Sequence, residues 1–238
     1  GYASEYYGIN TSFLISSGFA ALSLLFLLMI KDQEKFDRQE IEQSSSQAGI
    51  WDMVKDRKIL GSGLANFFNS LMFNAVATFF PLYAAVIGMN DAQVGLGLTA
   101  RGLSSTLVRL PVGAVSNRIG VLKLMIMGLV LSALTIFSVS LSEGLIIISV
   151  IMGLQGIAYG VYLTAGSTYV TESAPSEQKG TAMGIYSTFG NISRIVSPIT
   201  LGIIGEVWGL RGVLQTAAVI SIVGSGAIWF LTRNDPKD

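Results

Sequence analysis

The chain contains neither cysteine nor histidine among its 238 residues. Without cysteine it has no disulfide, no thiol nucleophile and no thiolate metal site. Without histidine it lacks the side chain that most often moves protons or binds metals near neutral pH. Charged residues make up only 13% of the chain and their net charge is zero, against roughly 25% charged residues in an average globular protein. We therefore expect no enzyme, no metal, no cofactor and no nucleic-acid partner.

Long apolar stretches dominate what is present. A helix needs about 20 predominantly apolar residues to cross the roughly 30 Å hydrocarbon core of a bilayer. Stretches of this kind hold most of the chain, so we predict an all-α membrane protein with seven transmembrane helices. Their approximate ranges are 9–30, 59–87, 92–116, 121–141, 144–170, 181–207 and 211–232.

The first stretch differs from a secretory signal peptide, because it lacks a basic n-region and exceeds the usual apolar core of about 7–15 residues. The chain also begins at Gly1 rather than at methionine, and we expect an upstream part. The predicted regions are an extracellular start with the first span (1–30), a cytoplasmic linker ending in a short surface helix (31–58), a six-helix bundle (59–232) and a cytoplasmic tail (233–238).

Basic residues predict the orientation, because cytoplasmic loops of membrane proteins carry an excess of lysine and arginine. With the end of the first span placed in the cytoplasm, Arg211 is the one basic loop residue outside. The other basic residues of the loops and tail fall inside: Lys31, Lys35, Arg38, Lys55, Arg57, Lys58, Arg118, Lys123, Lys179, Arg233 and Lys237. We expect a multi-pass protein of the cell membrane, with its N-terminus outside and its C-terminus in the cytoplasm.

Polar side chains are distributed unequally among the spans. Away from their ends, the first, fourth and seventh spans carry only Ser, Thr and Gln215 as polar residues. The other four carry amides and arginines. An arginine at the bilayer centre costs at least roughly 2.5–3.5 kcal/mol of insertion free energy, so such residues normally face a cavity. We expect four helices to line a central cavity and three to face lipid. The polar residues in question are Asn66, Asn69, Asn74, Arg101, Arg109, Gln155 and Arg194.

Several of these side chains lie near the middle of their helices, where secondary transporters bind their solutes. The amides have a second interpretation, because Asn and Gln often hydrogen-bond neighbouring helices as ordinary packing. The arginines are harder to explain in this way, since no Asp or Glu lies near the middle of any span. The predicted substrate pathway consists of Asn69, Asn74, Arg101, Gln155, Tyr159 and Arg194.

Arg109 lies near the cytoplasmic end of the third span, two residues before Pro111. At that depth a guanidinium can reach the interface or pair with a carboxylate on another helix. Glu172, at the cytoplasmic end of the fifth span, is the nearest suitable partner by depth. We predict a structural or gating ion pair between Arg109 and Glu172.

Two loop sequences have recognisable motifs. The first, over 109–120, has a glycine, three residues, a polar residue, a basic residue, one residue and a glycine. The second runs from Glu172 to Gly184. The first resembles a loop signature of the major facilitator superfamily, and the second is similar to that family's loop between helices ten and eleven. The family usually has Asp at the position of Asn117. Asn carries no charge and cannot form the ion pair that this Asp would supply. The predicted cytoplasmic gate comprises Arg109, Pro111, Gly113, Asn117, Arg118, Gly120 and Glu172.

The resemblance implies helices six to twelve of a twelve-helix secondary transporter, working by alternating access with an N-terminal six-helix half. It implies a small-molecule solute, and many family members export theirs. The coupling ion stays open between the proton and others; if transport is proton-driven, the titrating acid would lie in the missing half. The arginines favour an anionic or strongly hydrogen-bonding solute. A seven-helix receptor is disfavoured, because no lysine lies inside the last helices for a retinal Schiff base. A non-transporting module, or a split half assembling with a partner or a second copy, stays open.

Overall fold

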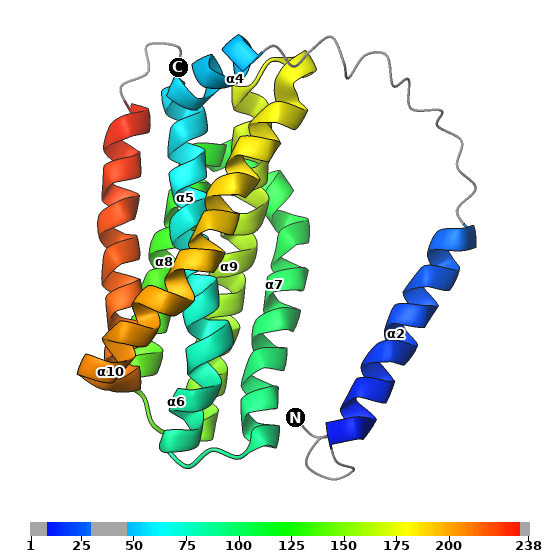
Figure 1. The fold of residues 1–238 in the computed structure, drawn as a ribbon, viewed down its shortest axis with the longest axis vertical. Helices are drawn as coiled ribbons and strands as arrows, with labels where there is room; N and C mark the ends of the chain where they lie inside the picture. Colours follow the sequence, from blue (N-terminus) through cyan, green and yellow to red (C-terminus); the bar gives the residue numbers. More distant parts are fainter. Residues whose placement is uncertain (1–8, 30–46, 234–238) are drawn as a thin grey trace.

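The computed structural model describes residues 9–29 and 47–233, and this part of the chain is helical with no strand. The prediction of an all-α membrane protein is therefore confirmed for the described residues. Figure 1 shows long helices packed side by side in a bundle. In chain order they are α2 (Ile9–Met29), α4 (Gln47–Lys55), α5 (Arg57–Asn74), the π-helix η1 (Ala75–Phe79), α6 (Phe80–Val86), α7 (Asp91–Ile119), α8 (Val121–Leu141), α9 (Leu145–Ser173), the 3-10 helix η2 (Ser176–Gln178) and α10 (Lys179–Arg233).

Two parts of the bundle differ in whether their helix is continuous. The elements α5, η1 and α6 follow one another without a gap and form one rod over 57–86. In contrast, α10 consists of two arms, because Gly209 has φ 70° and ψ 177° and interrupts the helix. Only glycine adopts such a backbone without strain. The arms 179–208 and 210–233 run in opposite directions (Figure 1), so the predicted break between 207 and 211 is confirmed.

Four described segments are long and apolar enough to cross a membrane: 57–86, 121–141, 145–173 and 176–232, the last containing both arms of α10. Helix α7 has 29 residues and is therefore about 43 Å long at 1.5 Å per residue, but its arginines and other polar residues make it less apolar. The all-α membrane class follows from these segments, and the number of seven spans stays a prediction.

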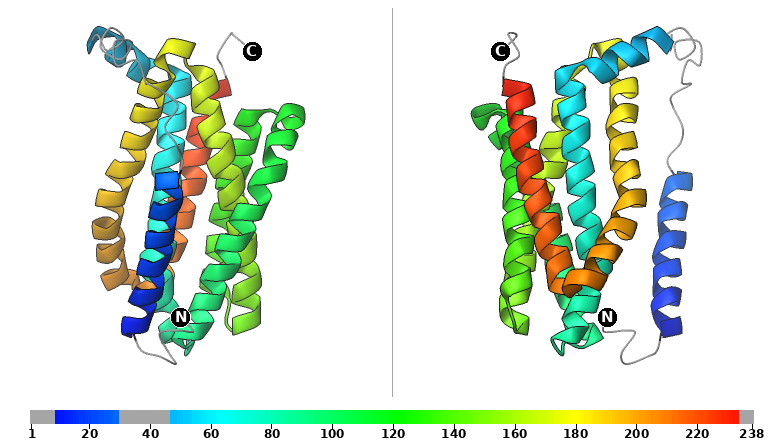
Figure 2. Two further views of the ribbon diagram at one scale, coloured as in Figure 1. Left: turned by 90° about the vertical axis from the view of Figure 1, so that its right-hand side faces the viewer. Right: turned by 60° about the vertical axis from the view of Figure 1, so that its left-hand side comes forward.

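Helix α2 lies apart from the bundle (Figures 1 and 2). The large apolar side chains that the structure describes between Phe13 and Phe26 are exposed, with Phe13, Phe19 and Phe26 exposed to 70%, 71% and 65%. Lipid or another helix would cover such a surface, since soluble proteins rarely leave contiguous apolar patches of this kind open. Helix α4 occupies the place of the short helix predicted at the end of the linker, whose first part, 31–46, lies outside the described residues.

Local sequence signals explain where the helices of the bundle begin. Asp56 caps α5 by accepting hydrogen bonds from the backbone N–H groups of the first turn. Asn90 and Gln93 form a reciprocal capping box at the start of α7, which satisfies amide groups that have no partner inside the helix. Gly120 has φ 92° and is the whole connection between α7 and α8.

Helices α7 and α9 approach each other so closely that two glycines are required between them. A Cβ on Gly156 would overlap the backbone carbonyl oxygen of Arg101, and a Cβ on Gly160 would lie 2.5 Å from the carbonyl oxygen of Ser105. Glycines four residues apart on one helix face are a common means of close packing in membranes. This contact fixes the backbone of Arg101 directly against α9, which positions the site described next.

Candidate functional site

The side chain of Arg101 lies against two aromatic rings from neighbouring helices. Its Cζ atom is 5.1 Å from the ring centroid of Phe73 on α5 and 4.9 Å from that of Tyr159 on α9. The two ring centroids are 5.7 Å apart with their planes inclined by 32°, so the rings form a platform on one side of the guanidinium. At these distances the negative faces of the rings attract the cation.

A chain of hydrogen bonds fixes the orientation of the guanidinium. Arg101 Nε donates to Gln155 Oε1 on α9 at 2.5 Å, and Gln155 Nε2 donates to Ser132 Oγ on α8 at 3.1 Å. Gln155 is 1% exposed, so both of its polar ends are used where water cannot replace them. We call Arg101, Phe73, Tyr159, Gln155 and Ser132 the Arg101 cluster; it joins α5, α7, α8 and α9.

The positive charge of Arg101 has no counter-ion in the part of the chain that the structure describes. Its Nη2 atom is buried and makes no hydrogen bond there, and no carboxylate of the described residues forms an ion pair with it. An uncompensated charge away from water costs several kcal/mol. The cluster therefore holds a guanidinium that is well oriented but incompletely satisfied.

Asn74 and Asn66 belong to a different contact, between α5 and the first arm of α10. Asn74 Nδ2 donates to Ser197 Oγ at 2.7 Å, and Asn66 Nδ2 donates to the backbone oxygen of Tyr186 at 2.8 Å. The alternative interpretation of amides as interhelical packing fits these two residues. Asn69 is buried, and its Oδ1 atom has no partner among the described residues.

Arg194 is exposed on the first arm of α10. Unlike Arg101, it makes no hydrogen bond, ion pair or ring contact with a described residue. The structure thus brings Arg101, Gln155 and Tyr159 together, as predicted, but it does not include Arg194 in this cluster. A pathway role for Arg194 stays a prediction.

The predicted cytoplasmic gate is only partly assembled. Asn117, Gly120 and Glu172 line one cavity of about 570 Å³, with Lys123 and Trp229 among the other lining residues. The remaining members lie on α7, where they are exposed: Arg109, Pro111, Gly113 and Arg118.

One prediction for this gate is corrected by the structure. Arg109 Nη2 donates to Ser105 Oγ on its own helix at 3.4 Å, and no ion pair with Glu172 is formed among the described residues. The reason is geometric, since residues four apart lie on the same helix face, whereas equal depth does not make side chains point toward each other.

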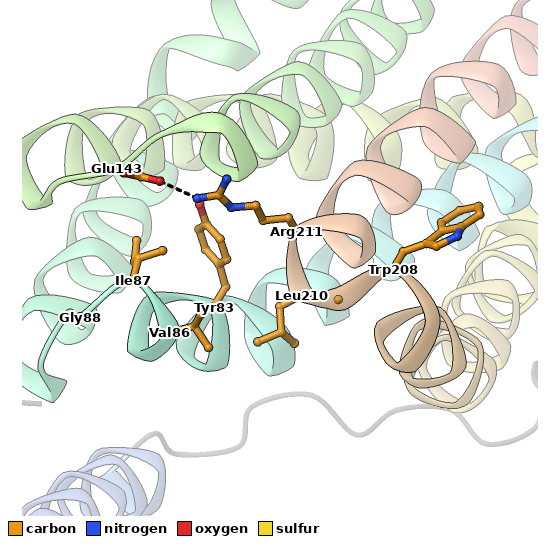
Figure 3. Close-up of a pocket in the computed structure, with 9 residues that line it drawn as sticks. Tyr83, Val86, Ile87, Gly88, Glu143, Trp208, Leu210 and Arg211 are labelled. Carbon is orange, nitrogen blue, oxygen red and sulfur yellow. Dashed lines mark hydrogen bonds and ion pairs between the residues drawn. The ribbon is translucent and has the colours of Figure 1, made fainter.

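A second cavity, which the sequence did not indicate, lies at the opposite end of the bundle (Figure 3). It has a volume of about 860 Å³ and is lined by Tyr83, Val86, Ile87, Gly88, Glu143, Trp208, Gly209, Leu210 and Arg211. Arg211 Nη2 and Glu143 Oε1 are 2.5 Å apart, with side chains exposed to 55% and 71%. Exposed ion pairs of this kind contribute little to stability, so we treat this pair as a loop contact.

Residues 62–238 match the family model described as the Major Facilitator Superfamily. An uncharacterized MFS-type transporter of Methanocaldococcus jannaschii is 21% identical over 230 residues, which cover 94% of this chain and 58% of that protein. A multidrug resistance protein of Klebsiella pneumoniae is 20% identical, with 92% and 55% covered. A proton-coupled antiporter flippase of Staphylococcus saprophyticus is 21% identical, with 85% and 51% covered. The chain thus spans about half the length of these relatives.

Proposed function

Because the chain belongs to the Major Facilitator Superfamily, we propose that it supplies one six-helix bundle of a secondary transporter for a small solute. The proposed bundle is 59–232, and a second six-helix bundle faces it across a central solute pathway. Alternating access then arises as the two bundles rock around the fixed site, as in transporters built from paired repeats. The names of the relatives, which include transporters and a multidrug resistance protein, support this proposal.

The observation that carries the proposal is the position of the Arg101 cluster. Phe73 lies near the middle of the rod 57–86, Ser132 near the middle of α8, and Tyr159 at the middle of α9. An arginine at this depth is costly in lipid and is normally found facing a bundle interior or a water-filled cavity. Four helices therefore contribute to one polar site at a depth where a solute would bind.

We further propose that the carrier is an exporter of the cell membrane and that its coupling ion is the proton. One relative is named a proton-coupled antiporter. No carboxylate of the described residues lies near the middle of the rod 57–86, of α7, α8 or α9, or of either arm of α10, and the whole chain contains no histidine. The proton-binding acid would then belong to the second bundle. The proposed orientation places α4 and the basic loops in the cytoplasm.

A transport assay tests the proposal. Everted membrane vesicles from cells producing the chain are given a proton gradient, and uptake of fluorescein, an anionic dye, and ethidium, a cationic one, is followed by fluorescence. Where the chain is assembled with a second bundle, we expect uptake of at least one dye above that of vesicles without the chain. The variant Arg101→Gln, at equal abundance in the membrane, is expected to return this uptake to background.

The same chain in detergent distinguishes the alternative, a non-transporting module. Native mass measurement reports whether it assembles with a partner or with a second copy, either of which would complete a two-bundle carrier. A two-bundle assembly whose vesicles take up neither dye would contradict the transporter proposal and support the module.

A further inference from the structure

We infer that Arg101 is the recognition point for an oxyanion on the transported solute, namely a carboxylate, phosphonate or phosphate group. This inference rests on the proposed function, and it adds the chemical class of the solute. Most N–H donors of the Arg101 guanidinium have no acceptor among the described residues. A guanidinium has five N–H donors in a planar fork, and within the described residues only Nε has a hydrogen-bond partner, Gln155 Oε1.

The contacts of Arg101 leave one particular part of the group unused. Arg101 Cζ lies over the rings of Phe73 and Tyr159, whose faces attract the cation but supply no oxygen acceptor. Gln155 occupies the Nε edge. What is left is the edge formed by the two terminal nitrogens, and its Nη2 atom is buried without a partner. Buried polar atoms in folded proteins nearly always have a partner, so an exception calls for a missing one.

Charge identifies what kind of partner is missing. A neutral acceptor would satisfy the N–H groups but would leave the cation uncompensated, and no described carboxylate pairs with it. A carboxylate or phosphate supplies both a negative charge and two oxygens at the spacing of the guanidinium fork. Such an oxyanion would bind edge-on, with the plane of its two oxygens continuing the plane of the guanidinium.

The site is also prepared for binding before the solute arrives. The hydrogen bonds from Arg101 to Gln155 and from Gln155 to Ser132 hold the group in one orientation, and the backbone of Arg101 is packed against Gly156. Little side-chain ordering is then required on binding, which is the part of the association cost that preorganisation removes. The ring platform beside the fork favours an oxyanion attached to an apolar or aromatic body.

The test is the thermal unfolding of the purified full chain in detergent, with benzoate, phenylphosphonate or the neutral benzamide added over a range of concentrations. We expect both anions to raise the midpoint of unfolding saturably and benzamide to leave it unchanged. In Arg101→Gln the apparent affinity for the anions should be at least about 10-fold weaker. Arg211→Gln, which removes an exposed arginine, should behave as the wild type. Equal responses to benzamide and benzoate, or an unchanged response in Arg101→Gln, would overturn the inference.

A second variant and a lipid comparison complete the test. If Arg101→Gln is not monodisperse, Arg101→Lys replaces it, because lysine keeps the positive charge but not the planar fork of N–H donors. An apparent affinity for the anions at least about 3-fold weaker than that of the wild type supports the inference. An unchanged affinity overturns it. Phosphatidylcholine nanodiscs with or without phosphatidic acid distinguish the source of the oxyanion. A shift with phosphatidic acid alone assigns the fork to a lipid headgroup, and a shift with phenylphosphonate assigns it to a free solute.

Failure of this inference can be separated from failure of the proposed function. Uptake of ethidium, without any Arg101-dependent response to anions, would contradict the anionic solute and keep the transporter. An Arg101-dependent response to anions, without uptake of either dye, would keep the oxyanion site and contradict transport.

Discussion

Gly156→Ala is expected to lower the free energy of unfolding of the bundle by about 3 kcal/mol or more, the upper range for overpacking a tight interface. The added methyl group would overlap the backbone carbonyl oxygen of Arg101. A backbone atom cannot rotate away as a flexible side chain can, so α7 and α9 must move apart. In a chain of this size the loss corresponds to a decrease of roughly 6–12 °C in the unfolding midpoint, measured in detergent.

Gly153→Ala is the matched control, one turn earlier on α9. A Cβ there would lie 3.6 Å from Ser104 Oγ, which is an ordinary van der Waals distance. Because alanine is a better helix former than glycine by up to about 1 kcal/mol, we expect the midpoint to stay constant or rise. Similar losses in the two variants would show that the close approach at Arg101 is not the cause.

Gln155→Leu is the second change for which we expect a large effect. It removes the hydrogen bond that Arg101 Nε donates and the one that Ser132 Oγ accepts. Hydrogen bonds to charged groups contribute about 1.5–3 kcal/mol, and leaving a buried charged donor unpaired adds its desolvation cost. We expect a loss of about 2–3 kcal/mol in the free energy of unfolding, measured as above.

Ser132→Ala separates the two hydrogen bonds of Gln155. It removes only the acceptor for Gln155 Nε2 and keeps the contact with Arg101, so the expected loss is about 1 kcal/mol, the usual value for a neutral hydrogen bond. If Ser132→Ala destabilises the chain as much as Gln155→Leu, the guanidinium is not what Gln155 stabilises.

The helices themselves could be predicted well from the sequence, because apolar length is a strong signal in a membrane. The predicted range 121–141 is that of α8, and the break before Arg211 is the kink at Gly209. The ends of α9 were less accurate, since the structure has 145–173 where the sequence predicted 144–170. An apolar stretch indicates only the part of a helix that lies in the hydrocarbon core. The backbone hydrogen bonds of the helix continue beyond that part, into polar residues.

The candidate site could be predicted only by residue type. Arg101, Gln155 and Tyr159 were singled out by their depth, and they do meet in the structure. Phe73 and Ser132 were missed, because an aromatic ring or a serine in an apolar helix carries no signal until the helix crossing is known. The ion pair of Arg109 with Glu172 was wrong for the same reason, since depth does not specify the direction of a side chain.

The central claim, that the Arg101 cluster borders a water-filled solute pathway inside the membrane, can be measured directly because the chain contains no cysteine. Tyr159→Cys places a single thiol on the cluster, and only its thiolate, which forms in water, reacts with a membrane-impermeant methanethiosulfonate reagent. Val223→Cys, on an exposed apolar surface of the second arm of α10, is the control for lipid. We predict that Tyr159→Cys is modified in sealed vesicles, that benzoate slows this reaction, and that Val223→Cys is not modified. A thiol at 159 that is as unreactive as the one at 223 until detergent unfolds the protein would contradict the account.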